Sequence, residues 1–349
     1  MGTVVHVLAN EKPTQNADND PLDIFCDVFE QNRSFFRNAS IRAAIAIGIF
    51  DLLTRPLNCE QLCAKLRLQP NRLRALLNVL RLEGVLEYQQ EGGTYLARRT
   101  PERGPVLPEY GWGRLAQVIR TDRPLGEIES SEHMPDTNVR LHDHLFEIGY
   151  PAARRLWECA GISSGHLLDI GSGSGAYSAA FLEMHGDAKA TLVDREEVLE
   201  MARYRLRNRA NRARFEPRDA FKPVSVQYDV VLLANMLHLY GPSDCAKLIA
   251  AATQPLRQGG CLVVKDLWVQ PDRSGPAVSV YFALNMALYT KAGHVYSVDQ
   301  VCKWVKGTGL TDLRVFNTAH SLIVTAKKRS NERLQGRTDI QTFTKKVPM

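Results

Sequence analysis

A glycine-rich turn in the middle of the chain carries the strongest chemical signal in this sequence. A strand-like apolar run breaks into a turn in which Gly171, Gly173 and Gly175 alternate with serines, and a helical stretch follows. Glycine is needed where a backbone turns sharply and must approach a ligand closely. Nineteen residues after Gly175, at the end of the next predicted strand, Asp194 is placed to bond both hydroxyls of an adenosine ribose. The turn therefore predicts a site for an adenosine-containing cofactor.

Carboxylates around the turn favour one such cofactor. The same letters fit a variant of the dinucleotide fingerprint, which holds a pyrophosphate. Asp169, just before the first glycine, can take the ammonium of a methionine and would repel a pyrophosphate. Asp219, after the third strand, is placed to reach the adenine amino group. Together with Arg195, Ala220 and Asn235, these residues predict an S-adenosylmethionine site, with S-adenosylhomocysteine as the product; a nicotinamide or flavin site, or a turn without a ligand, are the alternatives.

With these motifs, residues 22–327 resemble the class I S-adenosylmethionine-dependent methyltransferases. The resemblance is greater to the small-molecule O-methyltransferases of plants and bacteria, which include the caffeate and hydroxyindole enzymes. The motifs behind this resemblance are specific for the cofactor and indicate the methyl acceptor much more weakly. It implies a winged-helix domain that forms an intertwined homodimer and a wall of the partner's active site. It also implies O-methylation of a small, largely hydrophobic, aromatic and hydroxylated metabolite in secondary metabolism.

The residues that would remove the acceptor's proton follow from this resemblance. His238 comes after an apolar strand, at the sheet edge where ligands bind, and matches the family's general base. Imidazole, with its usual pKa of about 6.5, suits a phenol-like acceptor near neutral pH. The carboxylate that orients the histidine matches Asp266, although a glutamate is usual there. A third family residue, also a glutamate, falls on Val295, and the usual Asp-Trp after the histidine is Leu239-Tyr240.

These departures leave several interpretations open beside O-methylation with His238 as base. The same fold carries out C- or N-methylation, and some relatives bind the cofactor without transferring a methyl group. His238 could also cap the next helix or line the pocket wall.

An apolar, aromatic stretch is expected to lie over the acceptor. It contains Phe282, Met286 and Tyr289, with Asn285 able to hydrogen-bond a flat metabolite. Ordinary helix packing is the alternative. No metal site is expected, because the two histidines of His142-Asp143-His144 point in different directions on a helix.

The elements that position these residues form two parts. Helical patterns and a short hairpin around Gly92 predict an N-terminal winged helix, after which strands and helices alternate as in a doubly wound, Rossmann-like α/β sheet. We predict a flexible leader (residues 1–20), the winged-helix dimerisation domain (21–100) and a helical linker and substrate-pocket region (101–160). The cofactor-binding catalytic domain (161–327) and a basic tail (328–349) follow.

Composition limits the classes of function. The 349 residues carry a net charge of +6, of which +5 falls from Lys327 onward, so no basic groove for nucleic acid is indicated. A nucleic-acid methyltransferase and a cofactor-sensing transcription regulator are the rivals from other classes. No secretory signal or apolar membrane span is present, and seven scattered cysteines without a C-x-x-C pair fit reduced thiols. We expect a cytoplasmic protein with no membrane or nucleic-acid partner.

Overall fold

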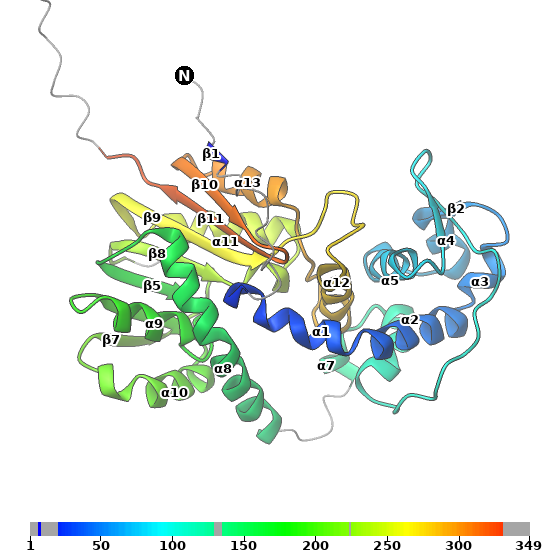
Figure 1. Cartoon of the computed structure of the whole chain (residues 1–349), viewed down its shortest axis with the longest axis horizontal. Coiled ribbons are helices and arrows are strands. Elements are labelled where there is room, and N and C mark those ends of the chain that lie inside the picture. The colour runs from blue at the N-terminus through cyan, green and yellow to red at the C-terminus, as the bar shows by residue number, and fades with distance from the viewer. Residues whose placement is uncertain (1–5, 8–19, 129–134, 223–224, 331–349) are drawn as a thin grey trace, which may run out of the picture.

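The computed structural model describes residues 6–7, 20–128, 135–222 and 225–330. A large sheet covered by helices forms one side of the molecule, and a bundle of N-terminal helices forms the other (Figure 1). This is the predicted class I methyltransferase fold with an N-terminal dimerisation domain.

The N-terminal part consists of short helices and a small antiparallel sheet. Its elements are η2 Pro21–Cys26, α1 Asp27–Gln31, α2 Arg33–Ile47, α3 Ile49–Leu52, β2 Leu57–Asn58, α4 Cys59–Leu66, α5 Pro70–Leu82, β3 Glu87–Gln89, β4 Thr94–Leu96, η3 Gly111–Arg114, α6 Leu115–Thr121 and α7 Leu125–Ile128. Strands β3 and β4 make the predicted hairpin, and β2 pairs with β4. Helix α4 starts in a capping box, in which the Asn58 side chain accepts from Gln61 N and the Gln61 side chain accepts from Asn58 N.

The C-terminal part is built on an eight-stranded sheet with the order β1-β10-β11-β9-β8-β5-β6-β7. Its elements are β1 His6–Val7, α8 Pro135–Ala160, β5 His166–Ile170, α9 Ala176–Met184, β6 Lys189–Asp194, α10 Glu196–Arg205, η4 Arg207–Arg209, β7 Ala213–Pro217, β8 Tyr228–Ala234, η5 Leu237–Leu239, α11 Pro242–Thr253, β9 Leu256–Leu267, α12 Ala277–Tyr289, α13 Val298–Lys306, β10 Thr311–Asn317 and β11 Ser321–Lys327. The five adjacent strands β9, β8, β5, β6 and β7 run parallel to one another, and β11 is antiparallel to both of its neighbours, β10 and β9.

Alternate residues of the central strands fill two different cores. Leu167 and Leu232 pack with α8, α9 and α10, whereas Leu168 and Val231 pack with α11 and α13. Successive side chains of a strand point to opposite faces, so a sheet buried on both faces reads as a continuous apolar run. The parallel ladder brings the carboxyl ends of β5, β6 and β8 to one edge, where the glycine turn, Asp194 and the residues after Ala234 meet.

Helix α12 leaves the sheet and joins the core of the N-terminal helices. Its buried residues share a hydrophobic cluster with α2, α5 and α6, and it lies directly beside α5 between the two parts of the molecule (Figure 1). Buried Arg72 of α5 donates to the Asp122 side chain at 2.8 Å and also to the backbone carbonyl of Ala287. The N-terminal part is thereby fixed against the region that follows β9.

Some elements differ from those expected. Strand β10 was not predicted, although exposed and buried residues alternate along part of Thr311–Asn317, as in a strand with one face in the core. The expected leader lies largely outside the described residues, within which His6–Val7 pairs with β10. Residues 331–349 of the expected tail also lie outside them. Within the described part of the chain, no helix is long and apolar enough to cross a membrane.

Candidate active site

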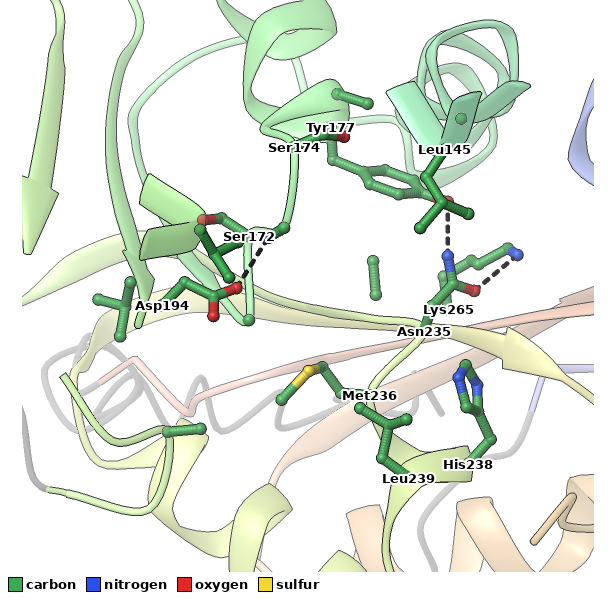
Figure 2. A pocket seen from close by; sticks show the side chains of 18 of the residues that line it. Leu145, Ser172, Ser174, Tyr177, Asp194, Asn235, Met236, His238, Leu239 and Lys265 are labelled. Atoms are coloured by element: carbon green, nitrogen blue, oxygen red, sulfur yellow. Dashed lines mark hydrogen bonds between the residues drawn. The ribbon is translucent and has the colours of Figure 1, made fainter. Parts of the chain in front are cut away.

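One large cavity lies at the carboxyl edge of the sheet and has a volume of about 920 Å³. The glycine turn and Asp194 lie on one side of it, and Asn235, Lys265 and His238 lie on the other (Figure 2). Helix α8 presents Leu145, Ile148, Gly149 and Ala152 to the cavity, a spacing that places them on one face of the helix. A volume of this size suits a cofactor together with a small acceptor.

Asp194 at the end of β6 is held by the backbone. Its Oδ2 accepts from Gly173 N at 2.9 Å, and its Oδ1 accepts from Arg195 N at 2.8 Å (Figure 2). Each carboxylate oxygen can accept more than one hydrogen bond, so both can still take a ribose hydroxyl. The geometry supports the role predicted for Asp194.

The three glycines of the turn do different things. Gly171 and Gly173 line the cavity, as expected; a Cβ on Gly171 would lie 2.1 Å from Met236 Sδ, whereas one on Gly173 would meet nothing within 4 Å. Gly175 does not line the cavity. It has a φ of +82°, and its Cβ would lie 2.8 Å from Leu206 Cδ1. Gly175 therefore allows α9 to start against the segment after α10, and its contact with the cofactor stays a prediction.

Asp169 is also placed differently from the prediction. Its carboxyl is buried, lies outside the cavity lining and accepts from Ser178 Oγ of α9 at 2.7 Å. The alternation of strand side chains turns Asp169 toward α9 instead of out of the strand end. Burial raises the pKa of Asp169 to about 7, and the Ser178 hydrogen bond only partly offsets this. Direct contact with the cofactor's ammonium is not supported.

Asp219, expected at the adenine, lines the cavity, as do two other residues expected to bind the cofactor. Arg195, Asp219 and Ala220 lie there together with Val198 of α10. The Asp219 carboxylate accepts from Phe221 N at 2.9 Å, which fixes one oxygen and leaves lone pairs for an amino group. This end combines an apolar wall with acceptors for N–H groups, as an adenine ring requires.

At the other end, His238 and Asp266 form a close pair. His238 Nδ1 lies 2.7 Å from Asp266 Oδ1, and His238 N donates to Asp266 Oδ2 at 3.2 Å. Burial raises the pKa of the Asp266 carboxyl, but His238, Lys265 and the N–H of Leu267 outweigh burial and hold that pKa below its usual value. An ionised Asp266 keeps the proton of His238 on Nδ1, so Nε2 is available as a proton acceptor.

Two further contacts fix the histidine. The Phe282 ring of α12 meets the His238 ring edge-on, with centroids 4.9 Å apart. His294 N donates to the backbone carbonyl of His238 at 2.9 Å, and a Cβ on Gly293 would lie 2.4 Å from that carbonyl oxygen. Val295, where the family has its third residue, is buried. The segment thus supports His238 through its backbone.

A polar cluster that the sequence did not single out lies on the His238 side of the cavity (Figure 2). Lys265 Nζ donates to Asn235 Oδ1 at 2.9 Å, and Asn235 Nδ2 donates to the Tyr177 hydroxyl at 3.4 Å (Figure 2). All three line the cavity, and Asn235 was expected there. A lysine directly after the apolar run Cys261–Val264 was the available signal for Lys265.

Of the four residues predicted to bind the acceptor, only Phe282 lines the cavity. Asn285 Oδ1 accepts from Trp112 Nε1 at 3.3 Å, Met286 is buried, and Tyr289 is 47% exposed. One face of α12 is turned to this cavity while the others pack in the N-terminal core or face solvent, so the acceptor roles of Asn285, Met286 and Tyr289 stay predictions.

The side chains of His142, Asp143 and His144 lie outside those that the structure describes. Among the described residues, no group of three or more His, Cys, Asp or Glu side chains is arranged to hold a metal ion.

Comparison with known proteins identifies two matching sequence families. The O-methyltransferase dimerisation domain matches residues 29–101, and the O-methyltransferase domain matches residues 152–311. The chain is 25% identical over 315 residues to a 3-hydroxy-5-methyl-1-naphthoate 3-O-methyltransferase from Streptomyces sahachiroi, covering 81% of this chain and 89% of that protein. It is 23% identical over 314 residues to acetylserotonin O-methyltransferase from Gallus gallus, covering 80% and 90%.

A solved structure shares the fold. An O-methyltransferase family 2 protein from Planctomyces limnophilus, in complex with apigenin, superposes with a TM-score of 0.68 at 22% identity. The match covers 87% of this chain and 96% of that one.

Proposed function

The chain belongs to the S-adenosylmethionine-dependent O-methyltransferases, and from this premise we propose that His238 is the general base for methyl transfer to the hydroxyl of a flat aromatic metabolite. S-adenosylmethionine supplies the methyl group on a sulfonium that leaves as a neutral thioether. The acceptor supplies a hydroxyl oxygen, and its proton must go to the protein.

The observation that carries the base assignment is the 2.7 Å contact between His238 Nδ1 and Asp266 Oδ1 at the cavity wall. Because Asp266 is buried and its pKa is lowered, its charge stabilises the imidazolium that forms when Nε2 accepts a proton. Phe282 packs against the ring and restricts its rotation. The enzyme's remaining task is to align the acceptor oxygen with the methyl group.

The acceptor end of the cavity is largely apolar. Leu145, Ile148, Leu267 and Phe282 line it from three different elements. Such walls favour a planar ring system over a flexible polar substrate. The naphthoate and acetylserotonin enzymes act, by their names, on hydroxylated or indole-type aromatic compounds, which supports the same class here.

We also propose that two copies of the chain assemble through the dimerisation domain at residues 29–101. A nucleic-acid role is not favoured, because Leu73, Leu76 and Leu77 bury the face of α5 that a recognition helix would expose. The seven free cysteines support the expected reducing, cytoplasmic compartment.

The direct test is His238→Ala with labelled S-adenosylmethionine and a panel of phenolic aromatic compounds. We expect kcat to fall by about 100-fold or more, the usual contribution of a general base, with the Kd for S-adenosylhomocysteine unchanged. Lys247→Ala on the exposed surface of α11 is a matched control. Near-normal kcat in His238→Ala would refute the base assignment, and mass spectrometry that located the methyl group on carbon or nitrogen would refute O-methylation.

A further inference from the structure

A buried lysine faces the same cavity, and no carboxylate of the described residues forms an ion pair with it. Lys265 of β9 is 4% exposed and lines the cavity next to the catalytic pair. Within the described residues, its ammonium has one hydrogen-bond acceptor, the neutral amide oxygen of Asn235. An ammonium has three donors, so two remain for a ligand.

The neighbouring carboxylate is already engaged. Asp266 Oδ1 accepts from His238 Nδ1 and from Leu267 N at 2.8 Å, and Oδ2 accepts from His238 N. No described carboxylate forms an ion pair with Lys265. The charge of Asp266 attracts Lys265, but the Asp266 oxygens accept from three other N–H groups. An anionic ligand group would give the buried ammonium a charged acceptor of its own.

The position of Lys265 relates this charge to the acceptor. The other charged residues of the described cavity lining are Asp194, Arg195, Arg218 and Asp219, which lie at the ends of β6 and β7. Lys265 is instead held by Asn235, three residues before His238 in the chain, and Figure 2 shows it on the His238 side, away from Asp194. The end of the cavity that receives the acceptor therefore has one fixed positive charge within an apolar wall.

We propose that Lys265 binds a carboxylate of the methyl acceptor, and that the acceptors are hydroxylated aromatic carboxylic acids. This inference rests on the proposed function and names the substrate class of the same site. The carboxylate stays unchanged: Lys265 holds it, the neighbouring hydroxyl oxygen takes the methyl group, and His238 takes the hydroxyl proton. The cofactor also has a carboxylate, so the experiment must separate the two sources.

The test compares hydroxynaphthoic acids, with the hydroxyl ortho or meta to the carboxylate, with their primary carboxamides. We expect wild-type kcat/KM to be at least about tenfold higher for the acid than for the amide, since a charge-assisted bond is lost in the amide. In Lys265→Met, which keeps the length and removes the charge, this ratio should fall to about 1. Lys265→Gln, which keeps a donor for Asn235, serves as a second variant with the same expectation.

Binding measurements keep this test independent of catalysis. Fluorescence titration of the acid and the amide into the S-adenosylhomocysteine-loaded enzyme should show the same preference, even if no acceptor in the panel is methylated. The proposal would be overturned if the wild type did not prefer the acid to the amide. It would also be overturned if both Lys265 variants kept the same preference as the wild type. An ester product would overturn it as well, because the carboxylate would then be the methyl acceptor.

The cofactor arm uses S-adenosylmethionine and its decarboxylated form without acceptor. If Lys265 serves the acceptor, Lys265→Met changes the Kd of both by less than about threefold. A selective loss for S-adenosylmethionine would assign Lys265 to the cofactor's carboxylate and overturn the acceptor assignment.

Discussion

The two ends of the cavity are built in different ways. At the adenosine end, backbone groups position the functional carboxylate. The Asp194 side chain accepts from Gly173 N, just after the end of β5, and from Arg195 N, just after the end of β6. At the acceptor end, side chains from separate elements position one another, as Asp266 of β9 and Phe282 of α12 do for His238. The first end depends on local backbone geometry, the second on tertiary packing.

This difference predicts how each end responds to substitution. A change at the adenosine end should alter the affinity for the cofactor or the stability of the turn and leave the alignment of His238 intact. A change at the acceptor end should alter turnover and leave cofactor affinity intact, because its residues lie on other strands.

The largest effect that would sharpen the comparison is expected for Asp194→Ala. Loss of two hydrogen bonds from ribose hydroxyls to a carboxylate should raise the Kd for S-adenosylhomocysteine by about 100-fold. Calorimetric titration measures this, and Asp187→Ala in the exposed turn before β6 is the matched control. An unchanged Kd would refute the ribose role of Asp194.

Gly175→Ala tests whether the third glycine serves the fold. Its positive φ and the close approach of Leu206 should lower the free energy of unfolding by about 2 kcal/mol. Gly173→Ala, at an open position beside the cavity, should cost less stability and weaken cofactor binding more. Denaturant unfolding measures the stability of both variants, and titration with S-adenosylhomocysteine measures their cofactor binding. If Gly175→Ala were as stable as the wild type, the structural role of Gly175 would be refuted.

Asp266→Asn should have the smallest effect of the three, lowering kcat by about tenfold with cofactor affinity unchanged. The substitution removes the charge that stabilises the protonated His238. Because both residues act as one unit, adding this change to His238→Ala should cause little further loss. Single-turnover rates of the double variant measure this, with Asp244→Asn as a surface control. Fully additive losses would contradict a positioning role.

The adenosine end could be predicted in detail because its signals are local. Gly173, Asp194 and Asp219 follow successive parallel strands, whose carboxyl ends must meet at one edge. Asp169 stands in the same motif, but its direction could not be predicted from the sequence. Its strand register turns the carboxyl toward Ser178, and a motif does not state the direction of a side chain at a strand end.

The acceptor end could be predicted only in part. His238 and Asp266 were predicted from a family resemblance. They are 28 positions apart in the chain, and the fold brings His238 Nδ1 to 2.7 Å from Asp266 Oδ1. The face of α12 that meets the cavity could not be predicted, since Asn285 and Met286 are as suitable in composition as Phe282. Which of them meets the cavity depends on how α12 packs against α5.

The sequence by itself determined the alternation of strands and helices, the glycine turn, the cofactor and the candidate base, because these depend on local periodicity and on residue types at strand ends. Only the tertiary structure decided that Gly175 packs against Leu206, that Asp169 faces α9, and that Lys265 enters the cavity beside Asn235. The physical reason is that a side chain's partners come from elements distant in the chain, and their distances are set by the packing of the whole core.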